Sequence, residues 1–444
     1  MGIFKSYDIR GIYNKDWDRE KAYRIGFFLP RLLNSKKIIV GRDIRLSSDE
    51  IFHTLSNGIN DAGADVLDIG LCDTPACYFA TAFYNITGSV MITASHNPKE
   101  YNGLKISREQ AIPVGYETGL NKLEAMSAGE VKPLSSKGKT EKLDIKSDYL
   151  KHLNKFKNGI GEIKAVIDGS NGMVGIFIHD VVKGLSAEIS FMYDNPDGNF
   201  PNHAPNPLIE ANLKDLEAKV VETKADVGIC FDGDADRVMF IDEKGKFISP
   251  DLITALIGLH FFKHYPEKPG KDKTVLYDVR SSRSVPEFIS KLGGSPTTCK
   301  VGHSHAKKLL RDTNGIYGGE LAGHYYFREN YYCDSGMIAA LTVLSILSIE
   351  KKPISELISS ISHYYYSGEI NFEVNDKKAV IDRIQKSYTY GELNTLDGIR
   401  IDFPEWWFNL RPSNTEPYLR LVVEANSPSE LEKRVEELTE KIKA

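Results

Sequence analysis

The stretch SVMITASHNP, residues 89–98, contains the change of pattern on which the prediction of the fold depends. Its first residues, Ser89–Ile92, predict a buried strand. A hydroxyl, an imidazole and an amide follow on Ser95, His96 and Asn97. Ligands of open α/β sheets bind where strands end, whereas Ser, Asn and Pro are also common in ordinary turns. The stretch therefore predicts either a functional strand exit or a structural turn.

Helix-type and strand-type patterns alternate on the N-terminal side of this stretch. Residues 19–33 predict a helix, Lys37–Asp43 a strand that runs into a turn, and Ser47–Ala62 a helix with acids in its first turn. A further strand, Ala64–Ile69, and a helix that begins at Thr74 complete the pattern. The order β-α-β-α-β predicts a mostly parallel, doubly wound sheet.

Two later segments begin in the same way as Lys37–Asp43. The apolar strands in Lys164–Ser170 and Thr274–Ser281 each reach an aspartate, Asp168 and Asp278, and each is followed by a helical stretch and a second strand. The long spacing between these aspartates predicts three similar domains in tandem and not a solenoid of short repeats.

The pattern changes near residue 365. Strands are predicted at Gly368–Val374, Gly398–Phe403 and Tyr418–Ala425, with a helix near 375–388, and Ser427–Glu430 is a capping box that opens a C-terminal helix. We therefore expect an α/β protein with three tandem doubly wound, mixed-sheet α/β domains and a smaller C-terminal α+β domain. The expected domain limits are 1–143, 144–248, 249–364 and 365–444.

The composition narrows the class of protein. Of the 444 residues, 41% are hydrophobic and 26% charged, values typical of folded domains, and the net charge of −5 gives no reason to expect nucleic acid or an anionic membrane as a partner. The five cysteines include no C-x-x-C pair and predict reduced thiols. The N-terminus lacks the apolar segment of a signal peptide, and the apolar run Ile338–Ile349 is too short to cross a bilayer. We therefore expect a soluble cytoplasmic protein.

An acidic loop, DGDADR at 232–237, lies between two predicted strands, 225–231 and 238–241. Its three carboxylates repel one another unless a cation neutralises them, and oxygen ligands select Mg²⁺ or Ca²⁺. An EF-hand is excluded because Arg237 stands where that loop needs glycine and because strands flank the acids. A solvated acidic turn is disfavoured because only glycine and alanine separate the acids. Mg²⁺ usually completes its shell with a phosphate oxygen, which a phosphorylated Ser95 would provide.

Two further loops carry polar groups. Gly318–His324 contains Glu320, which could bond sugar hydroxyls, and His324, which could contact phosphate or transfer a proton. Taken alone, this loop is more typical of a plain turn. Arg411–Pro417, RPSNTEP, combines a guanidinium, two hydroxyls and an amide between two prolines. These donors favour phosphate binding slightly over a structural turn.

Together these stretches resemble the α-D-phosphohexomutase superfamily and, within it, the phosphomannomutase/phosphoglucomutase branch. From Tyr7–Gly11 to the C-terminal loop, the resemblance covers the whole chain. It rests on four motifs in the family's order: TASHNP at 93–98, DGDADR at 232–237, GELAGH at 319–324 and RPSNTEP at 411–417. The resemblance implies four domains around a central cleft, each of which gives one loop.

The resemblance also implies a reaction. Phosphate is transferred reversibly between O1 and O6 of a hexose phosphate, mannose and/or glucose, through a phosphoserine and a bisphosphorylated sugar. One Mg²⁺, a hexose 1,6-bisphosphate activator and a monomer or weak homodimer are implied. The implied catalytic residues are Ser95, His96, Lys105, Arg10 and Arg237. The implied metal ligands are Ser95, Asp232, Asp234 and Asp236. The implied substrate-binding residues are Tyr7, Arg280, Gly302, His303, Glu320, Ala322, His324, Arg411, Ser413, Asn414 and Thr415.

Two positions depart from the family pattern. Ala322 stands where the sugar loop usually has serine, which removes one hydroxyl contact and leaves the sugar preference open. Arg280 stands where members commonly have lysine, so the charge is kept but its geometry differs. A phosphoglucosamine mutase, a non-catalytic sugar-phosphate-binding module and a metal-dependent phosphatase are the alternatives. The presence of Ser95 and all three acids argues against the module, and the S-N-T sequence leans away from the phosphoglucosamine branch.

Overall fold

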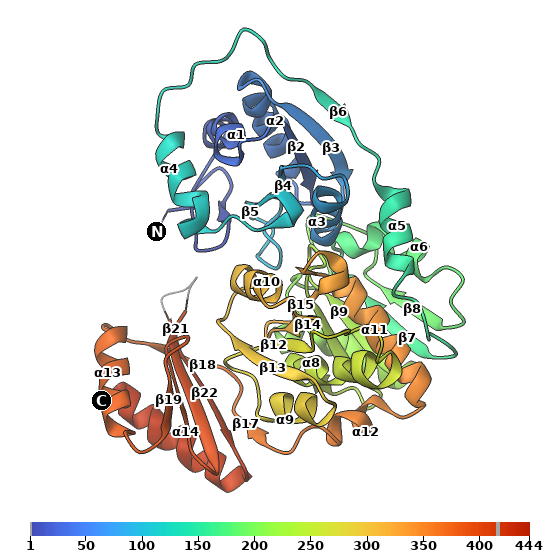
Figure 1. Cartoon of the computed structure of the whole chain (residues 1–444), viewed down its shortest axis with the longest axis vertical. Coiled ribbons are helices and arrows are strands. Elements are labelled where there is room, and N and C mark those ends of the chain that lie inside the picture. Colours follow the sequence, from blue (N-terminus) through green and yellow to red (C-terminus); the bar gives the residue numbers. More distant parts are fainter. Residues whose placement is uncertain (1, 414–417) are drawn as a thin grey trace.

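The computed structural model describes residues 2–413 and 418–444. These residues form four sheets, and domains 1 to 4 are named after them in chain order (Figure 1). Three sheets are mixed and the fourth is antiparallel, so the predicted fold class is confirmed.

Domain 1 has a six-stranded sheet in the order β1-β5-β4-β2-β3-β6. Strands β4, β2, β3 and β6 are parallel, whereas β5 and β1 run antiparallel to their neighbours. The strands are β1 (Ile9–Ile12), β2 (Lys37–Arg42), β3 (Asp65–Leu71), β4 (Gly88–Ile92), β5 (Tyr101–Arg108) and β6 (Thr140–Lys142). The helices are α1 (Arg19–Leu33), α2 (Ser48–Asp61), α3 (Thr74–Phe83) and α4 (Asn121–Ser127).

Domains 2 and 3 have five-stranded sheets in the orders β11-β10-β9-β7-β8 and β13-β12-β14-β15-β16. Domain 2 contains β7 (Lys164–Asp168), β8 (Glu188–Met192), β9 (Val227–Phe231), β10 (Val238–Asp242), β11 (Phe247–Ile248), α5 (Lys146–Asn154), α6 (Ile178–Val182) and α7 (Lys214–Thr223). Domain 3 contains β12 (Thr274–Asp278), β13 (Ser295–Cys299), β14 (Tyr317–Gly319), β15 (Tyr325–Phe327), β16 (Cys333–Asp334), α8 (Pro250–Leu259), α9 (Ser284–Lys291), α10 (His303–Asp312), α11 (Gly336–Glu350) and α12 (Ile354–Ser359).

The three mixed sheets share one topology. In each, the strand that ends at or next to a buried aspartate is central, with parallel partners on both sides, and the third strand continues into an antiparallel hairpin. The antiparallel edge strand of domain 1 comes from the N-terminus, whereas β11 and β16 follow their hairpins. The predicted similarity of three tandem domains is therefore visible in the strand order.

Domain 4 lies beside domain 3 in Figure 1 and has its own antiparallel sheet, β17-β22-β21-β20-β19, with β18 also paired to β22. Ser427 caps α14 by accepting from Glu430 N, as its capping box predicted. The domain contains β17 (Tyr365–Tyr366), β18 (Ile370–Glu373), β19 (Glu392–Asn394), β20 (Ile399–Asp402), β21 (Trp406–Pro412), β22 (Tyr418–Ala425), α13 (Lys377–Ser387) and α14 (Pro428–Lys443).

Strand β21 corrects one prediction. Arg411 and Pro412 were expected in a loop, but they end this strand. Every residue from Trp406 to Arg411 is buried, so the segment lacks the apolar–polar alternation by which a half-exposed strand is recognised.

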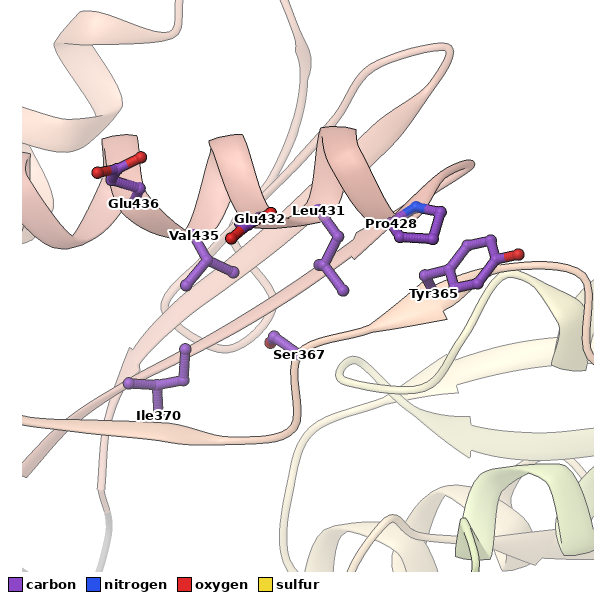
Figure 2. A pocket seen from close by; sticks show the side chains of 8 residues that line it. All are labelled: Tyr365, Ser367, Ile370, Pro428, Leu431, Glu432, Val435 and Glu436. Atoms are coloured by element: carbon purple, nitrogen blue, oxygen red, sulfur yellow. The ribbon is translucent and has the colours of Figure 1, made fainter.

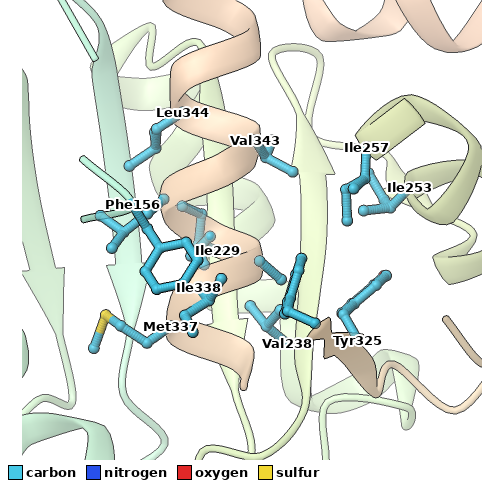
Figure 3. Packing of buried hydrophobic residues seen from close by; sticks show 14 of the residues in the cluster. Phe156, Ile229, Val238, Ile253, Ile257, Tyr325, Met337, Ile338, Val343 and Leu344 are labelled. Carbon is cyan, nitrogen blue, oxygen red and sulfur yellow. The ribbon is translucent and has the colours of Figure 1, made fainter. Parts of the chain in front are cut away.

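The largest hydrophobic cluster joins domains 2 and 3. Helix α11 is buried on all sides over most of its length. Figure 3 shows Ile338 of this helix close to Ile229 and Val238 of domain 2, and all three belong to the same cluster. The apolar run considered above as a membrane segment is therefore a central core helix. Among the described residues, none of the helices combines the length and apolar character needed to span a bilayer.

Candidate active site

Ser95 lies in the turn that follows β4, and its backbone is strained. Its φ of 52° is left-handed, a region that non-glycine residues seldom occupy. The buried hydroxyl donates to Asp232 Oδ2 at 2.7 Å, and Ser95 N donates to Thr93 Oγ1 at 2.9 Å. The strand predicted at Ser89–Ile92 is confirmed, and its exit presents the serine to the acidic loop of domain 2.

A buried arginine, Arg45, holds the backbone of this turn. Its Nε lies 3.2 Å from Asp43 Oδ2, and Asp43 Oδ1 accepts from Arg45 N at 3.0 Å. Its two Nη atoms donate, at 2.6–3.0 Å, to the carbonyl oxygens of Ser95, Asn97, Pro98 and Tyr101. One side chain therefore satisfies four backbone acceptors and fixes the strained conformation.

Three buried aspartates of the loop between β9 and β10 lie next to Ser95. One carboxylate oxygen each of Asp232, Asp234 and Asp236 lies within 4.8 Å of the others. Asp234 Oδ1 and Asp236 Oδ1 are buried and have no hydrogen-bond partner among the described residues. Burial and the charges of its two neighbours hold the pKa of Asp232 well above its ordinary value. Buried, unpartnered and mutually repelling oxygens fit a hard divalent cation, which would lower that pKa.

The acidic loop touches its neighbours backbone to backbone. A Cβ on Gly233 would lie 2.6 Å from the carbonyl oxygen of Ser95. A Cβ on Gly172, in the turn after β7, would lie 2.7 Å from the carbonyl oxygen of Gly233. Glycine at both positions is therefore required for Ser95 to approach the acids.

One ammonium group partly neutralises these acids. Nζ of Lys105, a buried residue of β5, donates to Asp234 Oδ2 and Asp236 Oδ2, both at 2.5 Å. Thr74 Oγ1, at the start of α3, also donates to Asp234 Oδ2 at 2.5 Å. Burial would lower the pKa of Lys105, but the carboxylates raise it above its ordinary value. Lys105 is therefore a fixed cation beside Ser95.

His96 and Arg10 complete the surroundings of Ser95. His96 Nδ1 lies 3.3 Å from Ser95 Oγ. Burial and the surrounding cations hold the pKa of His96 well below its ordinary value, so the ring is neutral and can accept a proton. Arg10 of β1 pairs with Asp8 and donates to Asn97 Oδ1 at 2.7 Å.

Arg237 is held by contacts that reach into domain 3. Its Nε donates to His324 Nε2 at 2.9 Å, so Nδ1 of His324 carries the ring proton. His324 Nδ1 lies 2.7 Å from Asp334 Oδ2, and Asp334 Oδ1 lies 2.7 Å from Nζ of the buried Lys307. This chain of charges orients the Arg237 guanidinium.

A second group of possible ligand atoms, on Asp236, His324 and Asp334, overlaps this chain. The proton on His324 Nδ1 blocks the only ring nitrogen that faces the acids. The ammonium of Lys307 neutralises one of them. These contacts favour a charge network over a second cation site.

Domain 1 also contacts the loop before α10. Tyr7 OH donates to the carbonyl oxygen of Val301 at 3.0 Å, and the ring centroids of Tyr7 and His303 are 5.5 Å apart. Gly302 has a left-handed φ of 126°, and a Cβ there would lie 2.5 Å from the Tyr7 ring. Gly302 N donates to Glu320 Oε2 at 3.1 Å. The structure therefore brings together these four of the predicted substrate-binding residues.

Both oxygens of Glu320 already accept hydrogen bonds. Tyr326 OH donates to Glu320 Oε1 at 2.6 Å, in addition to the bond from Gly302 N. Sugar hydroxyls would therefore use the remaining lone pairs of this carboxylate. Ala322, in the turn between β14 and β15, is half-buried and offers no side-chain hydrogen bond.

The residues predicted to hold a second phosphate form a separate cluster at the border of domains 3 and 4. Arg411 Nη2 and Arg280 Nη1 lie 3.1 and 3.3 Å from Glu369 Oε2. Ser413 N donates to the carbonyl oxygen of Tyr418 at 2.9 Å, just beyond the strand. Two further predicted members, Asn414 and Thr415, lie outside the described residues.

Several residues of these clusters were not predicted from the sequence. They are Arg45, Thr74, Lys307, Asp334 and Glu369. The repeated pattern Asp-x-Arg, at Asp43–Arg45 and Asp278–Arg280, could have identified Arg45. No local pattern marks Glu369, because its partners are remote in sequence.

Four family models match the chain, one after another. They describe phosphoglucomutase/phosphomannomutase α/β/α domain I at residues 1–131, domain II at 147–245, domain III at 249–365 and the C-terminal domain at 369–441. Together they cover most of the sequence, and each contains one of the four motifs quoted above.

Individual relatives agree along the full length. A phosphomannomutase of Vibrio cholerae is 39% identical over 461 residues, with 100% of this chain and 98% of that protein covered. One of Methanocaldococcus jannaschii is 37% identical, with 98% and 96% covered. A solved structure of a phosphoglucomutase/phosphomannomutase family protein from Burkholderia thailandensis superposes with a TM-score of 0.88 at 31% identity, covering 99% of this chain and 97% of that one. The chain belongs to the phosphoglucomutase/phosphomannomutase family and is a phosphohexomutase.

Proposed function

We propose that this phosphohexomutase transfers a phosphoryl group between O1 and O6 of mannose or glucose phosphate, with Ser95 as the phosphate carrier. The observation that carries the proposal is the position of Ser95 Oγ, 2.7 Å from Asp232 Oδ2 and among three buried carboxylates. A serine that attacks an acyl group, as in a serine hydrolase, needs no such cluster of acids. A phosphorylated serine with a divalent cation does, because both bring charges that the acids and nearby cations balance.

Asp232, Asp234 and Asp236 would hold one Mg²⁺ together with an oxygen of the phosphate on Ser95. When bound, this cation supplies electrostatic stabilisation of the charge on the transferring phosphoryl group. Gly233, which lies between two of these acids, packs against the Ser95 backbone and so keeps the acids next to the serine.

The proton and the remaining charges are assigned to side chains around Ser95. The sugar hydroxyl that attacks phosphorus would give its proton to His96, and Ser95 Oγ would take up a proton from His96 as its bond to phosphorus breaks and the new bond forms. His96, neutral and 3.3 Å from Ser95 Oγ, is placed to exchange a proton on the serine side. Lys105, Arg237 and Arg10 would balance the charge of the phosphoryl group.

The substrate would be held at two distant points. Tyr7, His303 and Glu320 would position the sugar, and Arg411 with Ser413, Asn414 and Thr415 would bind the phosphate that does not react. The first transfer yields a hexose 1,6-bisphosphate, which turns around and returns its other phosphate to Ser95. Bisphosphate from outside would restore enzyme that has lost its phosphate, and so act as an activator.

The sugar class remains hexose phosphate with mannose and glucose as the two proposed substrates. The two sugars differ only at C2, and the side chain of Ala322 has no hydroxyl with which to distinguish them. Reduced cysteines support a cytoplasmic location, and all five are buried and free. We expect a monomer or weak homodimer, which light scattering would test.

Intact-mass spectrometry of the purified protein, with site mapping, tests the mechanism. We expect one phosphate on Ser95 after incubation with glucose 1,6-bisphosphate. Coupled assays with mannose 1-phosphate, glucose 1-phosphate and glucosamine 6-phosphate then rank the substrates. Phosphate on another residue would overturn the role of Ser95. Free phosphate released as fast as product forms would indicate a phosphatase instead.

A further inference from the structure

The turn that follows β12, residues 279–284, carries Arg280 and lies against the sheet of domain 4. Nη1 of Arg400, a buried residue of β20, donates to the carbonyl oxygen of Val279 at 2.8 Å and to that of Ser281 at 3.2 Å. These carbonyls belong to the residues on either side of Arg280. One guanidinium of domain 4 therefore holds the backbone of domain 3 on both sides of a predicted substrate-binding residue.

Arg400 is itself held in one orientation. Its Nε and Nη2 lie 2.9 and 3.1 Å from the two carboxylate oxygens of Asp402, on the same strand. Its Cζ lies 3.6 Å from the ring centroid of Trp407, which is fully buried. A bidentate ion pair and an aromatic contact leave the guanidinium little freedom. The remaining Nη1 is thereby directed at the turn of domain 3.

A row of paired residues in domain 4 holds the far end of the same turn. Trp407 of β21 lies opposite Asp402 of β20 and opposite Glu424 of β22 in the antiparallel register. Glu424 Oε1 accepts from Trp407 Nε1 at 2.6 Å and from the backbone N of Arg283 at 3.0 Å. The row, together with Arg400, therefore offers both donors and an acceptor to one turn of domain 3.

The row lies on the sheet face that α13 and α14 do not cover. Successive strand residues point to opposite faces, and Phe408, next to Trp407, belongs to the hydrophobic cluster that includes residues of both helices. Figure 2 shows a groove of about 550 Å³ between α14 and the segment that enters the sheet, with Leu431 and Ser367 on opposite sides. The chain therefore enters domain 4 beside a groove, and the polar row supplies contacts with the 279–284 turn.

The side chain of Arg280 is held by two carboxylates. Asp278, at the end of β12, accepts from its Nε and Nη2 at 3.1 and 2.7 Å. Its Nη1 lies 3.3 Å from Glu369 of domain 4, which also pairs with Arg411 and Arg420. Since Asp278 holds the guanidinium at the strand end, its direction depends on the backbone of the turn, which is the part that domain 4 holds.

We propose that Arg400 is a positioning residue of the mutase reaction, which orients Arg280 from the neighbouring domain. Arg280 then has its substrate-binding geometry only while domain 4 is docked, that is, while Arg400 bonds the carbonyls of the turn. The substrate site of domain 3 is thus completed by the docking of domain 4. The inference rests on the proposed function, because it takes Arg280 as one of the residues that bind the hexose phosphate.

Hydrogen exchange of the ligand-free protein tests the hold on the turn. The amides of Ser281, Ser282 and Arg283 all donate hydrogen bonds, so their exchange is protected. We expect Arg400→Met to speed their exchange at least about fivefold relative to the amides of α10, because a general loss of stability would speed both groups. Asp402 keeps a cation in this variant, since Arg283 Nη2 lies 3.1 Å from it.

Arg434→Met is the matched control. Arg434 also stacks on a tryptophan, with its Cζ 4.4 Å from the ring centroid of Trp406, and pairs with two glutamates at 2.7 Å. It lies on α14 and should leave exchange in the turn unchanged. Equal exchange in Arg400→Met and the wild type would overturn the inference whatever the activity. Arg400→Lys, with a shorter reach, serves if Arg400→Met unfolds, and it should change exchange in the same direction.

A double-mutant cycle tests whether Arg400 acts through Arg280. With the best of the three hexose phosphates as substrate, we expect Arg400→Met to raise KM about fivefold and to change kcat by less than about twofold. In the Arg280→Met background the same substitution should have little further effect on KM. Additive effects, or an unchanged KM in Arg280→Met, would overturn the positioning role.

The two measurements separate this inference from the proposed function. Faster exchange in the turn of Arg400→Met, combined with no turnover of any hexose phosphate by the wild type, would refute the proposed function alone. Normal turnover by the wild type, combined with unchanged exchange in Arg400→Met, would refute this inference alone.

Discussion

Domains 1 and 3 use the same position of the same topology in two different ways. Each has an aspartate at the end of its first parallel strand and an arginine two residues later, Asp43 with Arg45 and Asp278 with Arg280. In both, the aspartate Oδ1 accepts from the arginine backbone N, at 3.0 and 2.8 Å. Arg45 then turns inward onto the carbonyls of the Ser95 turn, whereas Arg280 reaches outward to Glu369 of domain 4. In domain 1 the arginine at this position therefore holds the backbone of a turn, and it is called the brace below. In domain 3 the arginine at the same position connects two domains.

Domain 2 has a serine at the equivalent position. Ser170 N donates to Asp168 Oδ1 at 2.8 Å, and Ser170 Oγ donates to the carbonyl oxygen of Phe231 at 2.6 Å. Phe231 directly precedes the acidic loop. In domains 1 and 2 the side chain two residues after the aspartate therefore supports the neighbouring strand exit, whereas in domain 3 it reaches domain 4.

The largest effect should come from Ser95, which lies in the turn that Arg45 holds. Ser95→Ala should lower kcat by at least about 10³-fold, because no other described hydroxyl occupies its place. Thermal unfolding should change little. Ser56→Ala is the control, since Ser56 Oγ is buried without a partner among the described residues and lies outside the site. Near-normal turnover of Ser95→Ala would show that the turn held by Arg45 does not present a catalytic residue.

Breaking the brace itself should cost mainly stability. Arg45→Met leaves Asp43 buried without its cation and four carbonyls without their donor, so we expect a loss of about 3–5 kcal/mol in the free energy of unfolding. Urea unfolding measures it, and kcat of the folded fraction should fall too. Arg45→Lys should rescue little, since one ammonium cannot replace the fork of two Nη atoms. Full rescue by lysine would show that only the charge matters.

Arg280→Lys tests the corresponding arginine of domain 3. Lysine keeps a charge near Asp278 but loses the reach to Glu369, whose side chain is 22% exposed. We expect a smaller loss in urea unfolding than for Arg45→Lys, because lysine can still pair with the buried Asp278 and the ion pair with Glu369 that it loses is partly exposed. A loss as large as that of Arg45→Lys would mean that the two arginines have the same structural role.

The smallest effect is a difference in pH dependence between the two aspartates. Burial raises the pKa of Asp43 above 3.8, although Arg45 opposes it. Burial alone would also raise the pKa of Asp278, but Arg280 and two backbone donors outweigh the effect of burial and lower the pKa of Asp278 below 3.8. The stability that Asp43 contributes is thus full below pH 3.8 and is lost as the pH rises through its folded pKa. The stability that Asp278 contributes is full above pH 3.8 and is lost as the pH falls through its folded pKa.

Unfolding of Asp43→Asn and Asp278→Asn, each measured against the wild type between about pH 4 and pH 7, tests these signs. The cost of Asp43→Asn should shrink as the pH rises, and that of Asp278→Asn should stay constant. Parallel curves would contradict the difference between the two environments.

The sequence was most informative where chemistry and local pattern coincide. The strand before Ser95 and the acidic loop were predictable because apolar runs end abruptly in polar groups. Arg45 was not, since its four acceptors are carbonyls that lie about fifty residues further along the chain. Glu369 gave no signal for the same reason, because register and domain packing create its three contacts. The strand β21 was missed because burial on both faces removes alternation.

Helix α11 has a consequence for the order in which the protein is made. The sheet of domain 2 is complete once Ile248 has been synthesised, yet the helix that packs against Ile229 and Val238 begins only at Gly336. A growing chain on the ribosome therefore carries an apolar sheet face that α11 does not yet cover while the strands of domain 3 emerge. Such a face is a binding site for chaperones and a point of misassembly. Domain 4, with a hydrophobic cluster of its own, can condense afterwards without waiting for any earlier part.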